Sequence, residues 1–97
     1  MGTFHHGKGD LHGITVVVDT PGSIVYVGRC DTITPQGVIL LDADVHDASA
    51  PGAQGAPVSK EAYLKRAAAW GVFKRHDRVV VPHADVASVR PLGELAS

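Results

Sequence analysis

The sequence has little cysteine and no long apolar run, and each shortage excludes a class of protein. A single cysteine, Cys30, excludes an internal disulfide framework. No apolar stretch approaches the ~20 residues that a helix needs to cross a bilayer, and the first residues lack the charged start and apolar run of a secretory signal. We therefore expect a soluble, cytoplasmic protein.

Aromatic residues and net charge are also scarce. Only five of the 97 residues are aromatic, so the core has to be built from valine, isoleucine, leucine and alanine. This length predicts one domain. The net charge of -1 is too near zero to indicate a nucleic-acid or membrane partner, so a partner has to be sought in how the charges are distributed.

Three apolar runs, at 14–19, 24–29 and 38–45, form the strongest pattern in the chain. Each gap between them contains a proline and a glycine, which predicts a tight turn. In the first gap Pro21 and Gly22 suit a type II turn, in which the glycine has a positive φ. Three strands joined by two tight turns predict a small, strongly bent antiparallel sheet.

Alternation within the runs predicts which side chains are buried. The third run has the clearest pattern, because every second residue is apolar: Ile39, Leu41, Ala43 and Val45. The residues between them include Asp42, Asp44 and His46, so we expect that face to lie in solvent. Gly28 inside the second run predicts a bulge or a sharp bend, which a small barrel needs.

A helix is predicted between the third and fourth strands. Ser59 is a good N-cap, the 60–70 segment is rich in helix formers, and Gly71 suits the residue after the last turn. An apolar stripe along this helix is expected to pack on the barrel, and Val72 and Phe73 are expected to re-enter the core. The stripe consists of Tyr63, Leu64, Ala67, Ala68 and Trp70.

The last part of the chain, at 78–90, predicts a strand, a tight one-turn connection and a final strand. Pro82 ends the first of these strands because it has no N–H for the ladder. We therefore predict a mainly β fold, a small antiparallel barrel of about five strands with one helix inserted between strands 3 and 4. A single domain covers 1–97, with a Gly/His-rich N-terminal arm at 1–13 and a loop and helix insertion at 48–77.

This order of elements resembles the Sm-like family of SH3-type small β-barrels. The segment 26–31, Tyr-Val-Gly-Arg-Cys-Asp, is similar to that family's second strand, and the segment 40–43, Leu-Leu-Asp-Ala, is similar to its third. The segment 79–89 is similar to its short second motif of strand, tight turn and final strand. Over residues 14–45 and 78–91 the resemblance implies an Sm-like barrel that can form a ring through its edge strands.

The chain departs from this family where the family binds RNA. The Asp-x-Met-Asn element that holds a uridine base is replaced at 31–37, and the chain contains no asparagine. The segment 1–13 cannot supply the helix with which the family usually opens. The family's RNA-binding residues therefore do not carry over, although His83 lies near the place where one branch keeps a base-contacting histidine.

The charges of the chain are unevenly distributed. The 60–78 segment holds six basic and two acidic residues, a net charge of +4, while the rest of the chain holds three basic and eight acidic residues. Aromatic residues lie among these cations, and aromatic stacking beside cations is how proteins hold single strands. The sequence therefore predicts RNA or single-stranded DNA as a ligand. The predicted nucleic-acid-binding residues are Lys65, Arg66, Lys74, Arg75 and His83.

Two other interpretations of this segment stay open. The aromatic stripe is favoured to pack on the barrel, which leaves the charges as a solvated face. The segment can also dock on Asp42, Asp44 and Asp47 of a second copy, because opposite net charges on two parts of one chain suit self-association. A homo-oligomer is expected in either case, and an oligomer with a purely structural role is an alternative to the binding module.

Histidine is enriched in the N-terminal arm, which contains His5, His6 and His12. Neutral imidazoles are ligands of zinc and of other transition metals, so zinc is the candidate cofactor. The alternative function is a metal-binding protein or a metal-dependent enzyme that uses this arm and the pair His46 and Asp47. The spacing matches no established ligand motif and no serine has a Gly-x-Ser-x-Gly setting, so a non-enzymatic binding or scaffold module is the first hypothesis.

Overall fold

The computed structural model describes residues 13–50 and 57–95, and in this part of the chain five strands are joined by one α-helix and two short 3₁₀ helices. The strands are β1 (Thr15–Asp19), β2 (Ile24–Ile33), β3 (Gly37–Asp47), β4 (His76–Pro82) and β5 (Ser88–Pro91). The helices are α2 (Lys60–Trp70), η1 (His83–Asp85) and η2 (Leu92–Leu95). The mainly β fold with one helix between the third and fourth strands is confirmed.

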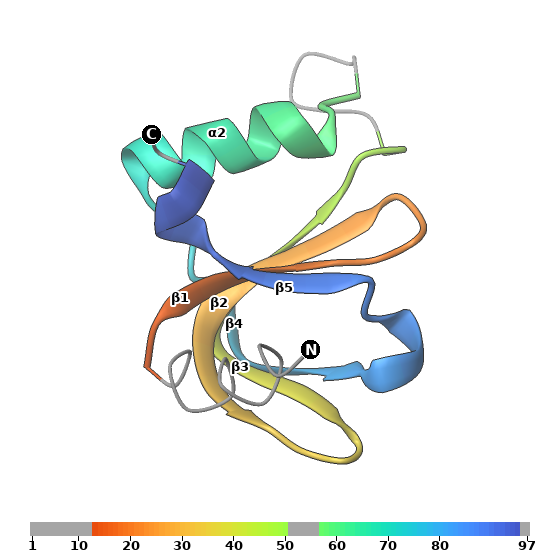
Figure 1. Cartoon of the computed structure of the whole chain (residues 1–97). Coiled ribbons are helices and arrows are strands. Elements are labelled where there is room, and N and C mark those ends of the chain that lie inside the picture. The colour runs from red at the N-terminus through yellow and green to blue at the C-terminus, as the bar shows by residue number, and fades with distance from the viewer. Residues whose placement is uncertain (1–12, 51–56, 96–97) are drawn as a thin grey trace.

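The strands form one antiparallel sheet in the order β4-β3-β2-β1-β5. Figure 1 shows the long strands β2 and β3 bending strongly, so that the sheet curls around an interior. The edge strands β4 and β5 are linked through η1, and among the described residues no ladder joins one to the other. The sheet therefore has the curvature of a small barrel and keeps two open edges.

Gly28 gives the sheet its bend. The pairing of β2 with β3 shifts register between Val27 and Arg29, which is the mark of a bulge. A Cβ on Gly28 would lie 2.7 Å from the Cβ of Ala43 on the neighbouring strand, closer than two side chains can approach. The irregularity predicted at Gly28 is confirmed as a bend, because the extra residue belongs to β3 opposite it, and only glycine leaves room for this close approach.

A second feature of this bulge overturns the alternation predicted for β3. Asp42 has a φ of 50°, in the left-handed region, and adds one residue to β3 opposite the bend in β2. Before Asp42, Val38 and Leu40 are fully buried, whereas the predicted core residues Ile39 and Leu41 are only half-buried. The prediction was wrong for this half of the strand. The extra residue shifts the alternation by one, so the residues before Asp42 point to the face opposite to the predicted one.

The core lies on both faces of the sheet. The inner face closes on itself within the curl and contains Val16, Val18, Cys30, Ile33, Val38, Leu40, Ala43 and Val81. The outer face of β1 and β2 is covered by α2 and η2, where Val17, Val25 and Val27 pack against Leu64, Ala67 and Leu92. Figure 1 shows α2, with the short helix η2 beside it, across one end of the curled sheet. All three consecutive valines of β1 are buried because both of its faces are covered.

The predicted ends of α2 are confirmed. The Ser59 hydroxyl accepts a hydrogen bond of 3.1 Å from the Ala62 N–H, a contact that stabilises a helix by about 1 kcal/mol. At the other end Gly71 has a φ of 99°, and its N–H donates to the carbonyl of Ala67 at 2.8 Å. The helix therefore ends at Trp70, as Gly71 predicts.

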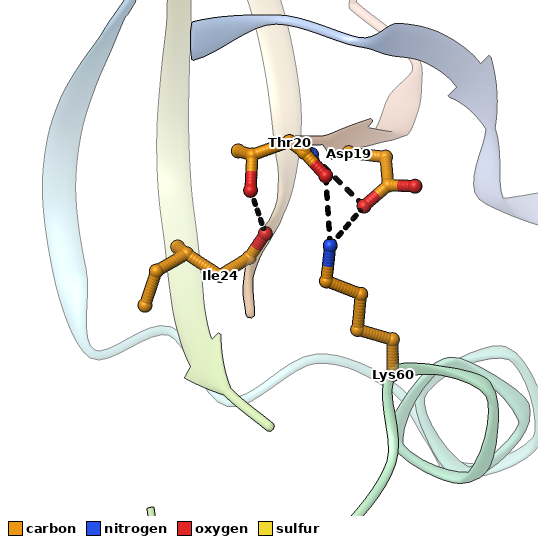
Figure 2. A network of polar contacts seen from close by, with 4 residues as sticks. All are labelled: Asp19, Thr20, Ile24 and Lys60. Carbon is orange, nitrogen blue, oxygen red and sulfur yellow. Dashed lines mark hydrogen bonds and ion pairs between the residues drawn. The ribbon is translucent and has the colours of Figure 1, made fainter. Parts of the chain in front are cut away.

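The turn between β1 and β2 is tied to the start of α2 (Figure 2). The Lys60 ammonium lies 2.6 Å from Oδ1 of Asp19 and donates to the Thr20 carbonyl at 2.9 Å. The Thr20 N–H donates to the same oxygen of Asp19, and its hydroxyl donates to the Ile24 carbonyl. These side chains shape the turn, and Gly22 does not adopt the positive φ predicted for it. Lys60 is therefore a structural tether rather than a free cation of the basic segment.

Candidate functional site

A groove of about 440 Å³ opens between α2, the end of β3 and the extended segment 71–75. One side of it is formed by two stacked rings. The rings of His46 and Tyr63 lie within 2° of parallel, with centroids 4.4 Å apart. The Nε2 atom of His46 lies 2.7 Å from the carbonyl oxygen of Val58, a contact that fixes the imidazole ring. The groove therefore has one preorganised aromatic side.

The carboxylate of Asp44 lies buried beside these rings, with only 1% of the residue exposed. The Tyr63 hydroxyl donates a hydrogen bond of 2.7 Å to Oδ2. The other oxygen, Oδ1, has no hydrogen-bond donor among the described residues. The Nε atom of Arg75 lies 3.5 Å from it and forms an ion pair without hydrogen-bond geometry. Buried acceptors without a donor are rare in folded proteins, so this oxygen marks the groove as unusual.

The prediction that Asp44 lies in solvent is wrong. Asp44 does point to the opposite face from Ala43, as alternation requires, but Tyr63 of α2 and Arg75 cover that face. No local pattern in β3 indicates which residues a distant helix will cover. The signal that sequence reasoning missed is Tyr63 itself, because a phenol within an apolar stripe needs a hydrogen-bond partner once it is buried.

The Tyr63 hydroxyl is held in its protonated form. Burial raises the pKa of Tyr63 well above its usual range, and the hydrogen bond to Asp44 and the charge of that carboxylate raise it further. The phenol therefore remains a donor throughout the neutral pH range and keeps Oδ2 of Asp44 occupied. Oδ1 is the oxygen that receives no hydrogen bond from the described residues, and Oδ2 keeps a second lone pair.

Four of the predicted basic residues gather at this end of the molecule. Lys65 and Arg66 lie on the exposed side of α2, and Lys74 and Arg75 lie exposed in the segment 71–75. Arg66 and Arg75 line the groove, whereas Lys74 lines a separate hollow on the other side of the segment. Among the described residues, Arg75 is the one of these four with an acidic partner. Lys65, Arg66 and Lys74 therefore form no ion pair within the described residues.

The fifth predicted residue, His83, lies in a different place. Its Nε2 atom is 2.5 Å from the carbonyl oxygen of Thr34, and its backbone N–H donates to the Gln36 carbonyl at 3.3 Å. These contacts hold η1 against the turn between β2 and β3. Figure 1 shows this turn at the end of the sheet far from α2, so His83 does not share one site with the four cations.

Trp70 and Phe73 are exposed, which corrects the prediction that they join the core. The exposed fractions are 87% for Trp70 and 60% for Phe73. The part of the stripe that packs on the sheet is Leu64 and Ala67, with Tyr63 partly buried beside them. Trp70 is the last residue of the helix and lies in solvent, although Ala67 and Ala68 of the same turn pack on the outer core.

The exposed aromatic rings lie next to cations. Trp70 and Phe73 line a shallow hollow together with Arg66. The guanidinium carbon of Arg75 lies 5.2 Å from the centroid of the Phe73 ring, which is the geometry of a cation–π contact. Two arginines and two aromatic side chains therefore form one continuous surface beside the Asp44 groove.

The predicted metal ligands His5, His6 and His12 lie outside the described residues. Within residues 13–50 and 57–95, no three histidine, cysteine, aspartate or glutamate side chains are grouped so as to hold a metal ion. Cys30 is buried in the inner core, where burial raises the pKa of its thiol and the charge of Asp31 raises it further. The thiol therefore packs as a small apolar group and offers no reactive thiolate at neutral pH.

Comparison of the chain with models of known protein families and with curated proteins finds no match. The Sm-like resemblance stays a prediction, and the fold itself is a five-stranded antiparallel sheet with one inserted helix. None of the helices in the described part of the chain is both long and apolar enough to span a membrane. The function therefore has to be argued from the groove and the surface around it.

Proposed function

We propose that this chain is a non-enzymatic binding module that forms homo-oligomers and holds single-stranded RNA or DNA at its α2 end. The observation that carries the proposal is the exposure of Trp70 and Phe73 beside Arg66 and Arg75. Bases of any sequence stack on exposed aromatic rings, and cations next to those rings bind the phosphates. A core role would have buried these rings, so their exposure favours contact with a ligand.

The remaining charges at this end support the same ligand. Lys65, Arg66 and Lys74 have no acidic partner among the described residues. Such cations attract a polyanion over distances of about 10 Å at 0.1 M salt. Two other cations of the 60–78 segment already form ion pairs within the chain, Lys60 with Asp19 and Arg75 with Asp44. The positive surface is therefore smaller than the sequence alone suggests.

The binding of a single strand is expected to quench the fluorescence of Trp70. Trp70 is the only tryptophan in the chain, and it is exposed, so stacking of a base on the indole changes a signal from one known position. Replacing Trp70 and Phe73 together by alanine should weaken single-strand binding by roughly tenfold or more, because stacking contributes about 1–3 kcal/mol per base. Fluorescence anisotropy of labelled single-stranded RNA and DNA at low salt measures the affinity.

A matched control removes two exposed apolar side chains elsewhere. Ile14 and Val80 are 41% and 44% exposed, and neither lines the hollow formed by Trp70 and Phe73. The variant with alanine at positions 14 and 80 should bind single strands as the unmodified protein does. If the unmodified protein binds neither RNA nor DNA at low salt, the nucleic-acid proposal is wrong and the purely structural oligomer is the better interpretation.

The two open edges of the sheet support self-association. Among the strands of the described residues, β4 pairs only with β3 and β5 pairs only with β1, so each can offer a row of backbone groups to a second chain. The Sm-like resemblance implies a ring built through such edges. The other route, docking of the basic segment on acidic residues of a second copy, has less support. Asp44 is buried, and Asp42 lies 3.5 Å from Arg29 of its own chain.

We expect light scattering to give a mass of more than one chain, because the edges pair through backbone hydrogen bonds. The mass should be the same at low and moderate salt, since backbone pairing is screened little by ions, whereas docking through charges would weaken as salt is added. A mass that falls to one chain at moderate salt would favour the charge-based contact. A monomer at both salt concentrations would contradict self-association altogether.

A further inference from the structure

The Asp44 groove contains a hydrogen-bond acceptor that the chain itself leaves unused. Asp44 is almost completely buried, Tyr63 occupies its Oδ2, and Oδ1 has no donor among the described residues. A buried acceptor without a donor costs the folded state free energy, because water no longer solvates it. A ligand that brings N–H donors into the groove would remove this cost. The groove therefore favours a ligand with an N–H donor.

The rim of the groove adds a second requirement. Arg66 and Arg75 line it, and both are exposed, so the part of the ligand at the rim is favoured to be anionic. The aromatic sides of the groove and of the hollow beside it favour a flat ring. A ligand with a phosphate at one end and a flat, donor-bearing ring at the other is a nucleotide. The volume of about 440 Å³ lies in the range of small-ligand sites.

We infer that the groove reads guanine through the adjacent donors N1–H and N2–H of the base. One donates to Oδ1 of Asp44, and the other donates to the second lone pair of Oδ2, beside the Tyr63 hydrogen bond. This inference rests on the proposed single-strand binding, because the strand on the Trp70 and Phe73 surface supplies the base. Guanine is the one common base whose pairing edge presents two donors side by side, which suits a carboxylate. In a single strand these edges are free to be read.

The other bases fit the acceptor less well. The N3–H of uracil or thymine lies between two carbonyl oxygens, which the carboxylate repels. Adenine and cytosine each place an amino donor next to a ring nitrogen that is itself an acceptor. A site that holds a buried acceptor discriminates strongly against ligands that leave it unpaired. We therefore expect the groove to bind guanine most tightly of the common bases and to disfavour uracil.

Arg75 occupies the position that the base would take. Its Nε atom faces Oδ1 of Asp44 at 3.5 Å without a hydrogen bond, and its side chain is 64% exposed. The guanidinium thus neutralises the carboxylate without a hydrogen bond. It also lies over the Phe73 ring, and its exposure leaves it free to bind the phosphates of a strand. Exchange of this weak ion pair for hydrogen bonds from guanine gives Oδ1 the donor that it lacks in the unbound protein.

The inference is tested on the full chain with three labelled single strands: oligouridine, the same strand with one central guanosine, and the same strand with one central inosine. Guanosine should tighten binding by about tenfold or more relative to uridine, the discrimination typical of a two-bond contact to a base edge. Inosine keeps N1–H and lacks the amino group, so it should fall between the two. This comparison needs no variant of the protein.

Two matched variants test whether Asp44 causes the preference for guanosine. Asp44→Asn keeps the shape of the side chain but replaces one acceptor oxygen by an amide, and should reduce the guanosine preference to near unity. Asp42→Asn removes the same charge from the same strand outside the groove, and asparagine tolerates the left-handed backbone there, so the preference should persist. Thermal unfolding checks that both variants fold.

Each outcome decides between the two proposals. Equal binding of the three strands by the unmodified protein overturns the guanine inference and leaves single-strand binding intact. A guanosine preference that survives in Asp44→Asn overturns the role of Asp44. Binding of none of the strands overturns both the inference and the proposed function on which it rests.

Discussion

Alanine in place of Gly37 is expected to destabilise the fold by about 2–3 kcal/mol, the usual cost of forcing extra atoms into a closely packed position. A Cβ on Gly37 would collide with the carbonyl oxygen of Val81 and lie 3.1 Å from the Cα of Pro82. Both atoms belong to the backbone of β4, so no change of side-chain rotamer relieves the contact. β4 therefore has to move away from β3 at the pair formed by Gly37 and Pro82.

Urea unfolding of Gly37→Ala measures this effect, with Gly22→Ala as the matched control. A Cβ on Gly22 meets nothing within 4 Å, and its φ is not positive, so the control should change stability by less than about 1 kcal/mol and in the stabilising direction. For a domain of this size, the Gly37 variant should also melt roughly 10–20 °C lower. If Gly37→Ala unfolds at the same urea concentration as the unmodified protein, the close approach of β3 and β4 is wrong.

Much of the fold is predictable because it depends on signals that are local in the sequence. Ser59 and Gly71 mark the two ends of α2, and the helix lies between them as predicted. Gly28 marks the bend in β2. The connection 83–85 is one short turn, as Pro82 and the apolar residues around it indicate. Each of these signals acts within a few residues, so a single sequence is enough to read it.

The errors come from contacts between distant segments. The left-handed Asp42 exchanges the faces of β3, and nothing in the neighbouring residues requires an aspartate to adopt that conformation. The exposure of Trp70 depends on where α2 crosses the sheet, which periodicity along the helix does not reveal. Gly22 has no positive φ, and its turn is held in part by Lys60, which lies far along the chain.

The candidate site was predictable in its charges and not in its geometry. The basic residues of 60–78 are visible as a local excess of positive charge, and four of the five predicted residues do lie at one end of the molecule. The groove beside them was missed because it requires Asp44 of β3, Tyr63 of α2 and Arg75 to meet. His83 was grouped with the cations by a family resemblance, and the fold places it at the other end of the sheet.

Replacing four cations by glutamine is expected to weaken single-strand binding by about 10²- to 10³-fold at low salt. The four are Lys65, Arg66, Lys74 and Arg75. Each cation that contacts a phosphate releases condensed counterions, which contributes about 0.7 to the slope of log affinity against log salt for a single strand. Loss of all four should therefore flatten that slope by up to about 3. Anisotropy titrations over a series of salt concentrations measure both quantities.

Arg75 differs from the other three because its removal leaves Asp44 without its ion-pair partner. The triple variant of Lys65, Arg66 and Lys74 therefore tests the charge effect alone, since these residues have no acidic partner among the described residues. It should retain the melting temperature of the unmodified protein. The change in its salt slope should be about three quarters of the change in the four-site variant. A large loss of stability in the triple variant would show that these cations hold the fold.

A charge-matched pair decides whether the position of the cations matters. Arg78 on β4 and Arg90 on β5 are exposed cations outside the α2 surface. Their replacement by glutamine removes the same charge as the replacement of Lys65 and Arg66, yet it should weaken binding much less, because only cations near the strand release its counterions. Equal losses would mean that net charge, and not the α2 surface, governs binding. If the four-site variant binds as well as the unmodified protein, the basic segment serves packing or assembly, and the contact surface has to be sought at His83 and the N-terminal arm.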